Sequence, residues 1–93
     1  MPVAAIPKAH VTGAMDGVIK MIAGRDTGRI LGVHPVCHRG AELINEAALA
    51  LHMRATVADL ATTMHVYPPI GEGLKLCAQD FNRDITLLSC CAA

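Results

Sequence analysis

The fold is decided by residues 17–37, which read GVIKMIA (17–23), GRDTG (24–28) and RILGVHPVC (29–37). The first and third of these segments are rich in β-branched and long apolar side chains, which favour strands. The middle segment has a glycine at each end and turn-forming residues between them. Two apolar runs around such a loop predict a β-hairpin. Proline donates no ladder hydrogen bond, so we expect Pro35 near a strand end or on a sheet edge.

A helix is predicted over residues 40–53, where the apolar side chains change to helical spacing. The members of this stripe are Leu43, Ile44, Ala47, Ala48 and Leu51. Because alanine side chains are short, the stripe allows another backbone to approach closely.

Two shorter helices follow. Thr56 and Asp59 have the spacing of a capping box, with Asp in the usual Glu or Gln position, and predict a helix through Ala61. The segment Tyr67-Pro68-Pro69 ends that helix and forces an extended backbone, because proline restricts the residue before it. A third helix is predicted to run to about Asn82. One stripe of it carries Ile70, Leu74, Cys77 and Phe81.

The order of predicted elements is strand, strand, helix, helix, helix, with a strand or a short helix before Gly17. This order predicts an α+β fold in which helices pack on a small antiparallel sheet. A sheet of two or three strands is only marginally stable by itself. We therefore expect the domain to be supported by a partner.

The composition also points to a partner. Hydrophobic residues make up 53% of the 93 residues and charged residues only 17%, which is more apolar surface than one small domain buries. The excess is expected to cover another copy or the remainder of a larger protein. Eight basic residues balance eight acidic ones, and Tyr67 and Phe81 are the only aromatic residues, so the composition argues against nucleic-acid binding.

The apolar segments, the chain start and the cysteines indicate the compartment of the protein and its relation to membranes. No apolar run approaches the roughly 20 residues that span a bilayer, so no membrane span is expected. Residues 1–5, MPVAA, lack the charged region and long apolar core of a signal peptide. The four cysteines lack the spacing of a disulfide framework, which favours a reducing compartment and a cytoplasmic location.

The chain closes on SCCAA, residues 89–93, with two adjacent cysteines. Adjacent α-carbons lie about 3.8 Å apart, whereas disulfides prefer roughly 5.5–6 Å. Cys90 and Cys91 are therefore better suited to hold a soft metal ion with both sulfurs than to brace the fold. The alternative is that the pair is an incidental feature of the tail.

Other candidate residues carry weaker signals. His34, Cys37 and His38 invite a zinc hypothesis, but no fourth ligand has suitable spacing, and ordinary strand-end residues are the alternative. Cys77 lies on an apolar stripe and is interpreted as a small buried hydrophobe. His65 lies two residues before Tyr67. It either lines an interface with a partner together with Tyr67 or has a structural role.

Five segments together resemble the C-terminal dimerisation domain of the flavin-dependent pyridine nucleotide-disulfide oxidoreductases. GVIK (17–20), TGRILGV (27–33) and GAELI (40–44) are similar to the family as a whole. YPPIGEGLKL (67–76) and LSCCA (88–92) resemble its mercuric reductase branch. The resemblance covers nearly the whole chain. It implies a dimerisation domain over residues 1–88 and a Cys-Cys tail over residues 89–93.

The resemblance also implies roles for individual residues. In glutathione reductase and its relatives, a histidine oriented by a glutamate acts as acid/base across the dimer interface. Tyr67 stands in the histidine position and Glu72 in the glutamate position, so Tyr67 is expected to reach into the partner subunit's active site. A solvated carboxylate at a helix start is the alternative for Glu72. Cys90 and Cys91 are expected to capture Hg(II) and pass it to a cysteine pair on the other subunit, where reduced flavin converts it to Hg(0).

The chain departs from a complete reductase of this family. It has no Gly-x-Gly-x-x-Gly after a strand and no Cys-x4-Cys pair, so it has no recognisable site for FAD or NADPH. We expect it to be inactive alone and to be part of a longer, homodimeric enzyme. The first strand of the dimerisation domain is expected to precede Met1. Two alternatives stay open, a stand-alone soft-metal binding module and a purely structural dimerisation domain.

Overall fold

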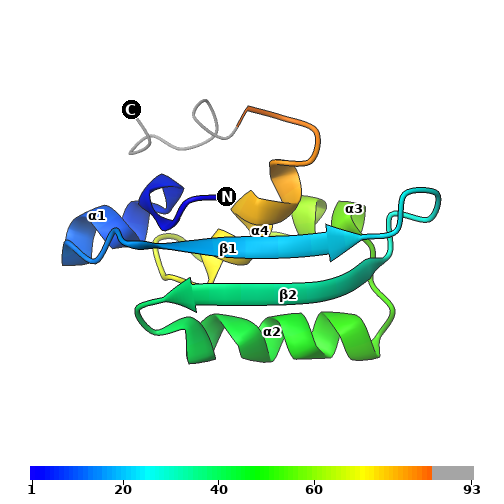
Figure 1. Ribbon diagram of the computed structural model, residues 1–93, viewed down its shortest axis with the longest axis horizontal. Helices are drawn as coiled ribbons and strands as arrows, with labels where there is room; N and C mark the ends of the chain where they lie inside the picture. Colours follow the sequence, from blue (N-terminus) through cyan, green and yellow to red (C-terminus); the bar gives the residue numbers. More distant parts are fainter. Residues whose placement is uncertain (85–93) are drawn as a thin grey trace.

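The computed structural model describes residues 1–84, and it shows a two-stranded sheet with helices packed against it (Figure 1). The predicted α+β class is confirmed. The elements are, in order, η1 (Val3–Ala5), α1 (Pro7–Thr12), β1 (Gly17–Ala23), β2 (Ile30–Cys37), α2 (Gly40–His52), α3 (Val57–Thr62) and α4 (Glu72–Gln79).

The predicted hairpin is present as β1 and β2, which pair in antiparallel register from Gly17 opposite Cys37 to Ala23 opposite Ile30. Pro35 lies inside β2 opposite Ile19, in a sheet where each strand is also an edge. The short helix expected as one option before Gly17 is present as η1 and α1. The chain start extends this sheet, because the Met1 ammonium group donates to the Ile19 carbonyl at 3.0 Å.

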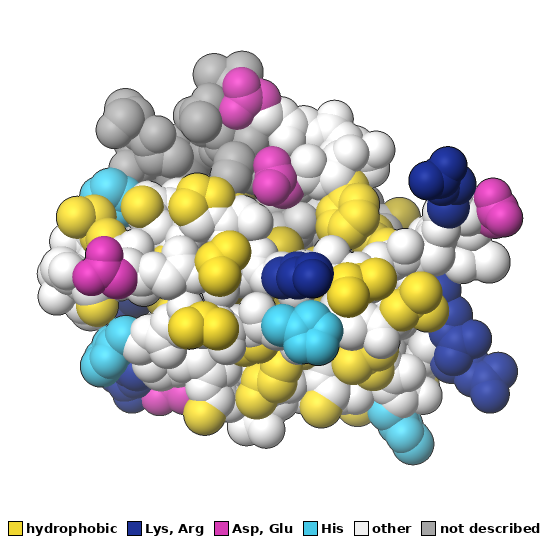
Figure 2. Space-filling view, in the orientation of Figure 1, with side chains coloured by type: hydrophobic (Ala, Val, Ile, Leu, Met, Phe, Trp, Pro, Cys, Tyr) yellow, Lys and Arg dark blue, Asp and Glu magenta, His cyan; other side chains and the backbone are white. Residues whose placement is uncertain are grey.

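The helices cover one face of the sheet, with α2 against β2 and α4 against β1 (Figure 1). Ile19 on β1 and Val33 on β2 point into the core, where they are 0% and 7% exposed. The side chains that alternate with them point outward, and Val18 and Val36 are 46% and 68% exposed. Figure 2 shows hydrophobic side chains spread over this outward face. The domain therefore has a closed core on one side of the hairpin and an open apolar surface on the other.

The first two predicted helices occur close to their expected positions. On α2, Leu43 and Ala47 are fully buried, whereas Ala48 is exposed and so does not belong to the buried stripe. The capping box that opens α3 is present in both directions. The Asp59 amide donates to Thr56 Oγ1 at 3.2 Å, and the Thr56 amide donates to Asp59 Oδ2 at 2.8 Å.

The prediction for the end of the third helix is wrong. Helix α4 ends at Gln79, and a turn follows in which the Arg83 amide donates to the Gln79 carbonyl at 3.0 Å. Leu74 and Cys77 are buried as expected, but Phe81 is 48% exposed, because it lies beyond the last helical turn and leaves the stripe. Phe81 instead lines an apolar hollow of about 440 Å³ beside β1, together with Met1 and Val18.

Helix α2 is the longest helix among residues 1–84, with 13 residues. It is therefore about 20 Å long, whereas the hydrocarbon core of a bilayer is about 30 Å thick. Within this part of the chain, no helix is long and apolar enough to cross a membrane.

Candidate functional site

Tyr67 lies in the loop between α3 and α4 and lines a cavity of about 350 Å³. The cavity is built from three segments that are distant in the sequence. Helix α1 contributes Lys8 and Thr12, the turn between β2 and α2 contributes His38 and Arg39, and the first turn of α2 contributes Glu42. The third wall is the Tyr67 loop itself. The resemblance predicts that Tyr67 reaches into a partner subunit's active site, but it did not indicate which residues of its own chain surround it.

The Tyr67 loop is held by proline and by one buried anchor. The rings of Pro68 and Pro69 fix the φ torsions directly after Tyr67, and the Tyr67–Pro68 peptide bond is cis. Ile70 follows with only 9% exposure and ties the loop to the core. Tyr67 itself is 51% exposed, so its ring lies at the boundary between the cavity and the solvent. A position that is partly buried and partly solvent-exposed suits a phenol, which has an apolar ring and a polar hydroxyl group.

The basic side chains around this cavity outnumber the acidic ones. Among residues 1–84, Lys8, His38 and Arg39 line it, and Glu42 is the one carboxylate. Arg39 bonds Glu42 through Nε at 2.9 Å and Nη2 at 2.6 Å, and both contacts end on the same oxygen, Oε1. Arg39 also has φ of 59°, in the left-handed region that disfavours residues with a Cβ.

Glu72, the first residue of α4, does not line the cavity of Tyr67. Its Oε2 atom is buried and has no hydrogen-bond partner among residues 1–84. Burial raises the pKa of the Glu72 carboxyl, and the nearby Lys75 and His65 partly oppose this rise. The alternative of a solvated carboxylate is therefore wrong for this oxygen, which is desolvated at the helix start.

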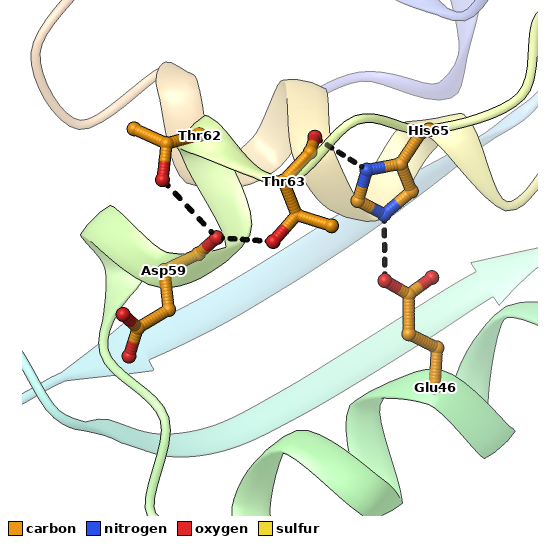
Figure 3. A network of polar contacts seen from close by, with 5 residues as sticks. All are labelled: Glu46, Asp59, Thr62, Thr63 and His65. Atoms are coloured by element: carbon orange, nitrogen blue, oxygen red, sulfur yellow. Dashed lines mark hydrogen bonds and ion pairs between the residues drawn. The ribbon is translucent and has the colours of Figure 1, made fainter.

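His65 has a structural partner that the sequence did not indicate. Its Nε2 lies 2.6 Å from Glu46 Oε1 on α2, and its Nδ1 lies 3.1 Å from the Thr63 carbonyl (Figure 3). The His65 side chain is only 10% exposed. Nε2 thus faces a carboxylate and Nδ1 faces a backbone carbonyl, so both ring nitrogens are engaged. The pair joins the segment before Tyr67 to α2, and Glu46 was missed because no local pattern links positions 19 residues apart.

The hypothesis of a zinc site at the end of β2 finds no support in the geometry. His34 is exposed on the outward face of the sheet, whereas Cys37, three residues later, points toward the core side. Across residues 1–84, no three histidine, cysteine, aspartate or glutamate side chains gather as a metal site. His38 lines the cavity of Tyr67 instead.

The two described cysteines are poor candidates for capturing a metal ion. Burial raises the pKa of the Cys37 thiol, and it also raises that of the Cys77 thiol. Cys77 Sγ is buried and lies 3.6 Å from the Ile19 carbonyl, to which it donates. Because the thiolate is the reactive form, both thiols are disfavoured as nucleophiles and ligands. Cys90 and Cys91, the predicted metal ligands, lie outside the described residues.

Comparison with known proteins is consistent with this arrangement. Residues 1–78 match the dimerisation domain of the pyridine nucleotide-disulphide oxidoreductases. The mercuric reductase of Shewanella putrefaciens is 47% identical over 94% of the chain, and that of Lysinibacillus sphaericus is 42% identical over 99%. The chain spans only 16% and 17% of these relatives.

A solved structure shares the fold as well. The HOCl-induced flavoprotein disulfide reductase of Escherichia coli is 32% identical, with a TM-score of 0.75 over 80% of this chain and 17% of that one. The resemblance found in the sequence therefore extends to the arrangement of the helices and the hairpin.

Proposed function

The chain belongs to the pyridine nucleotide-disulphide oxidoreductases as their dimerisation domain, and from this we propose that it serves as that domain in a mercury(II) reductase. The observation that carries the proposal is the match to mercuric reductases, at 40–47% identity, over nearly the whole chain. Residues 1–88 form the dimerisation domain, and residues 89–93 form a tail that captures Hg(II). The parent enzyme works in the cytoplasm.

The open surfaces of the domain support a role in dimer formation. Val36 on the outward sheet face is 68% exposed, and Met64 and Val66 beside Tyr67 are 93% and 78% exposed. Exposed apolar groups of this size are typical of surfaces that a partner covers. A homodimer in which each copy covers the other's apolar surface accounts for them.

Tyr67 is the proposed catalytic residue that this domain supplies to the partner subunit. Its loop is anchored on one side by Ile70 and on the other by the contact of His65 with Glu46. This double anchoring holds the phenol at the rim of its cavity, where it can donate to or accept from a bound metal complex. Glu72 is proposed to act with Tyr67, as a desolvated carboxyl group at the start of the helix that follows the same loop.

Cys90 and Cys91 are the proposed ligands for Hg(II). A soft ion prefers thiolates, and the two described thiols are disfavoured by burial, which leaves the tail pair for capture. Each transfer is a thiol exchange in which one mercury–sulfur bond forms while another breaks, without a change of oxidation state. Reduction to Hg(0) requires two electrons, and FAD and NADPH held by the rest of the parent chain supply them.

The test is a titration of the 93-residue chain with Hg(II) in competition with a monothiol. We expect tight one-to-one binding that is lost in Cys90→Ala/Cys91→Ala. The matched control is Cys37→Ala/Cys77→Ala, which removes two thiols but keeps the tail, and it should bind as the unmodified chain does. Circular dichroism checks that each variant is folded. Equal, weak binding by all three chains would contradict capture by the tail and leave a dimerisation domain.

A further inference from the structure

The cavity beside Tyr67 has the charge and shape of a site for a small organic anion. Its volume of about 350 Å³ falls in the range of small-molecule pockets. Figure 2 shows basic, histidine and acidic side chains close together at the end of the molecule where α1 lies and α2 begins. Lys8 and Arg39 each bring a positive charge, while Glu42, the single carboxylate that residues 1–84 contribute, is already bonded to Arg39.

Arg39 is placed so that it can accept a second partner. Both of its bonds to Glu42 end on Oε1, so the remaining guanidinium N–H groups can serve a further carboxylate. Its left-handed backbone, with φ of 59°, is a conformation that costs free energy for any residue with a Cβ. Such strain often accompanies residues whose side chains take part in binding.

Apart from Thr12, the other residues of the described chain that line the cavity are mostly apolar. Val66, Pro69 and Ile70 line it beside the Tyr67 ring, and Ile70 is nearly buried. A ligand that fits this lining has one anionic group for the basic side and a compact, polarisable body for the apolar side.

We propose that the cavity binds a carboxylate-bearing thiol, the carrier on which Hg(II) reaches the protein. This inference rests on the proposed function, and it adds the class of donor that the site accepts. The carboxylate lies against Lys8 and Arg39, and the sulfur and its metal ion lie toward Tyr67. A protein thiolate then forms a bond to mercury as the bond to the carrier sulfur breaks, and the carrier leaves as a thiolate that takes up a proton.

The first test uses metal-free mercaptosuccinate and the 93-residue chain with Cys90→Ala/Cys91→Ala, so that its result is independent of capture by the tail. Tyr67 is the only tyrosine and there is no tryptophan, so tyrosine fluorescence reports on the cavity directly. We expect saturable binding, with cysteamine and 2-mercaptoethanol binding at least about tenfold more weakly because they cannot form the charge-assisted hydrogen bonds.

The variant that decides the proposal is Arg39→Gly, which removes the guanidinium and also relieves the left-handed backbone. Arg54→Gly is a matched control, because Arg54 has φ of 56° and does not line the cavity. We expect Arg39→Gly and Lys8→Gln each to weaken mercaptosuccinate binding at least about tenfold, while Arg54→Gly leaves it unchanged.

Three results would overturn the proposal: equal affinity for the three thiols, equal affinity of Arg39→Gly and Arg54→Gly, or equally tight binding of inorganic phosphate. In the chain with its tail cysteines intact, the Hg(II) complex of mercaptosuccinate should release its metal faster than the complex of 2-mercaptoethanol. Loss of Hg(II) capture with mercaptosuccinate binding retained would contradict the proposed function and leave the anion site standing.

Discussion

The carboxyl group of Glu72 gives the domain an unusual dependence on pH. Its Oε2 is buried without a partner among residues 1–84, and burial raises its pKa above the ordinary value of 4.5. Between the ordinary and the raised pKa, the folded state binds more protons than the unfolded state. Stability therefore falls as the pH rises through this window, and the loss is constant above it.

Glu72→Gln removes this ionisation. We expect the melting temperature of the variant, relative to the unmodified chain, to be higher at pH 7 than at pH 4. Thermal unfolding by circular dichroism at both values measures the difference. Glu42→Gln is the control, because that carboxylate is exposed in a surface ion pair. A Glu72→Gln difference that does not change with pH would contradict the assignment of a desolvated carboxyl group.

Gly17 begins β1 with φ of 128°, a conformation that other residues rarely adopt. A Cβ at this position would collide with the Val36 carbonyl oxygen and lie 3.2 Å from Val3 Cγ2. We expect Gly17→Ala to lower the free energy of unfolding by about 1–3 kcal/mol, measured by urea denaturation. Gly71→Ala is the control, because a Cβ there meets nothing within 4 Å, and its effect should be small.

At the scale of the elements, the capping box is the clearest local stabiliser. Thr56→Ala removes the acceptor for the Asp59 amide and should cost about 1 kcal/mol in urea denaturation at pH 7. The Thr56 amide, which donates to the Asp59 carboxylate, and the Thr56 side chain lower the pKa of Asp59, so the stabilisation that this carboxylate provides is present above 3.8 and is lost as the pH falls through the lowered value. The cost of Asp59→Ala should therefore shrink at low pH, and an equal cost throughout would contradict the account.

The elements that were predicted correctly depend on local patterns. The hairpin follows from two apolar runs around a glycine loop, and α3 follows from the spacing of Thr56 and Asp59. The end of α4 was missed, because Phe81 continues the apolar period although the backbone turns after Gln79. Local apolar spacing does not report where tertiary packing stops a helix.

The candidate site was predicted only in part. The roles of Tyr67 and Glu72 come from the resemblance and stay predictions, and the cavity was not predicted, because it joins α1, the start of α2 and the Tyr67 loop. The contact of His65 with Glu46 was not predicted for the same reason, since the two residues are brought together only by the packing of the loop on α2. Contacts between distant segments leave no signal in one sequence.

At the scale of the whole molecule, the open sheet face is the surface through which we expect the domain to associate. Val18 and Val36 face each other across the two strands, and the Lys20–His34 pair follows along the same face. We expect the 93-residue chain to self-associate and Val36→Lys to shift it toward the monomer in sedimentation equilibrium, because a buried lysine lacks a partner there. Ala58→Lys, on α3, is the control. A monomeric unmodified chain at high concentration would contradict the association.

The most direct test of the central claim is Hg(II)-dependent oxidation of NADPH by the Shewanella putrefaciens mercuric reductase in which this chain replaces the matching segment. The account predicts a dimeric enzyme that reduces Hg(II), and turnover that falls in Tyr67→Phe and in Cys90→Ala/Cys91→Ala while both stay dimeric. A folded, dimeric and flavin-loaded chimera that fails to oxidise NADPH with Hg(II), or that is indifferent to these substitutions, would contradict it.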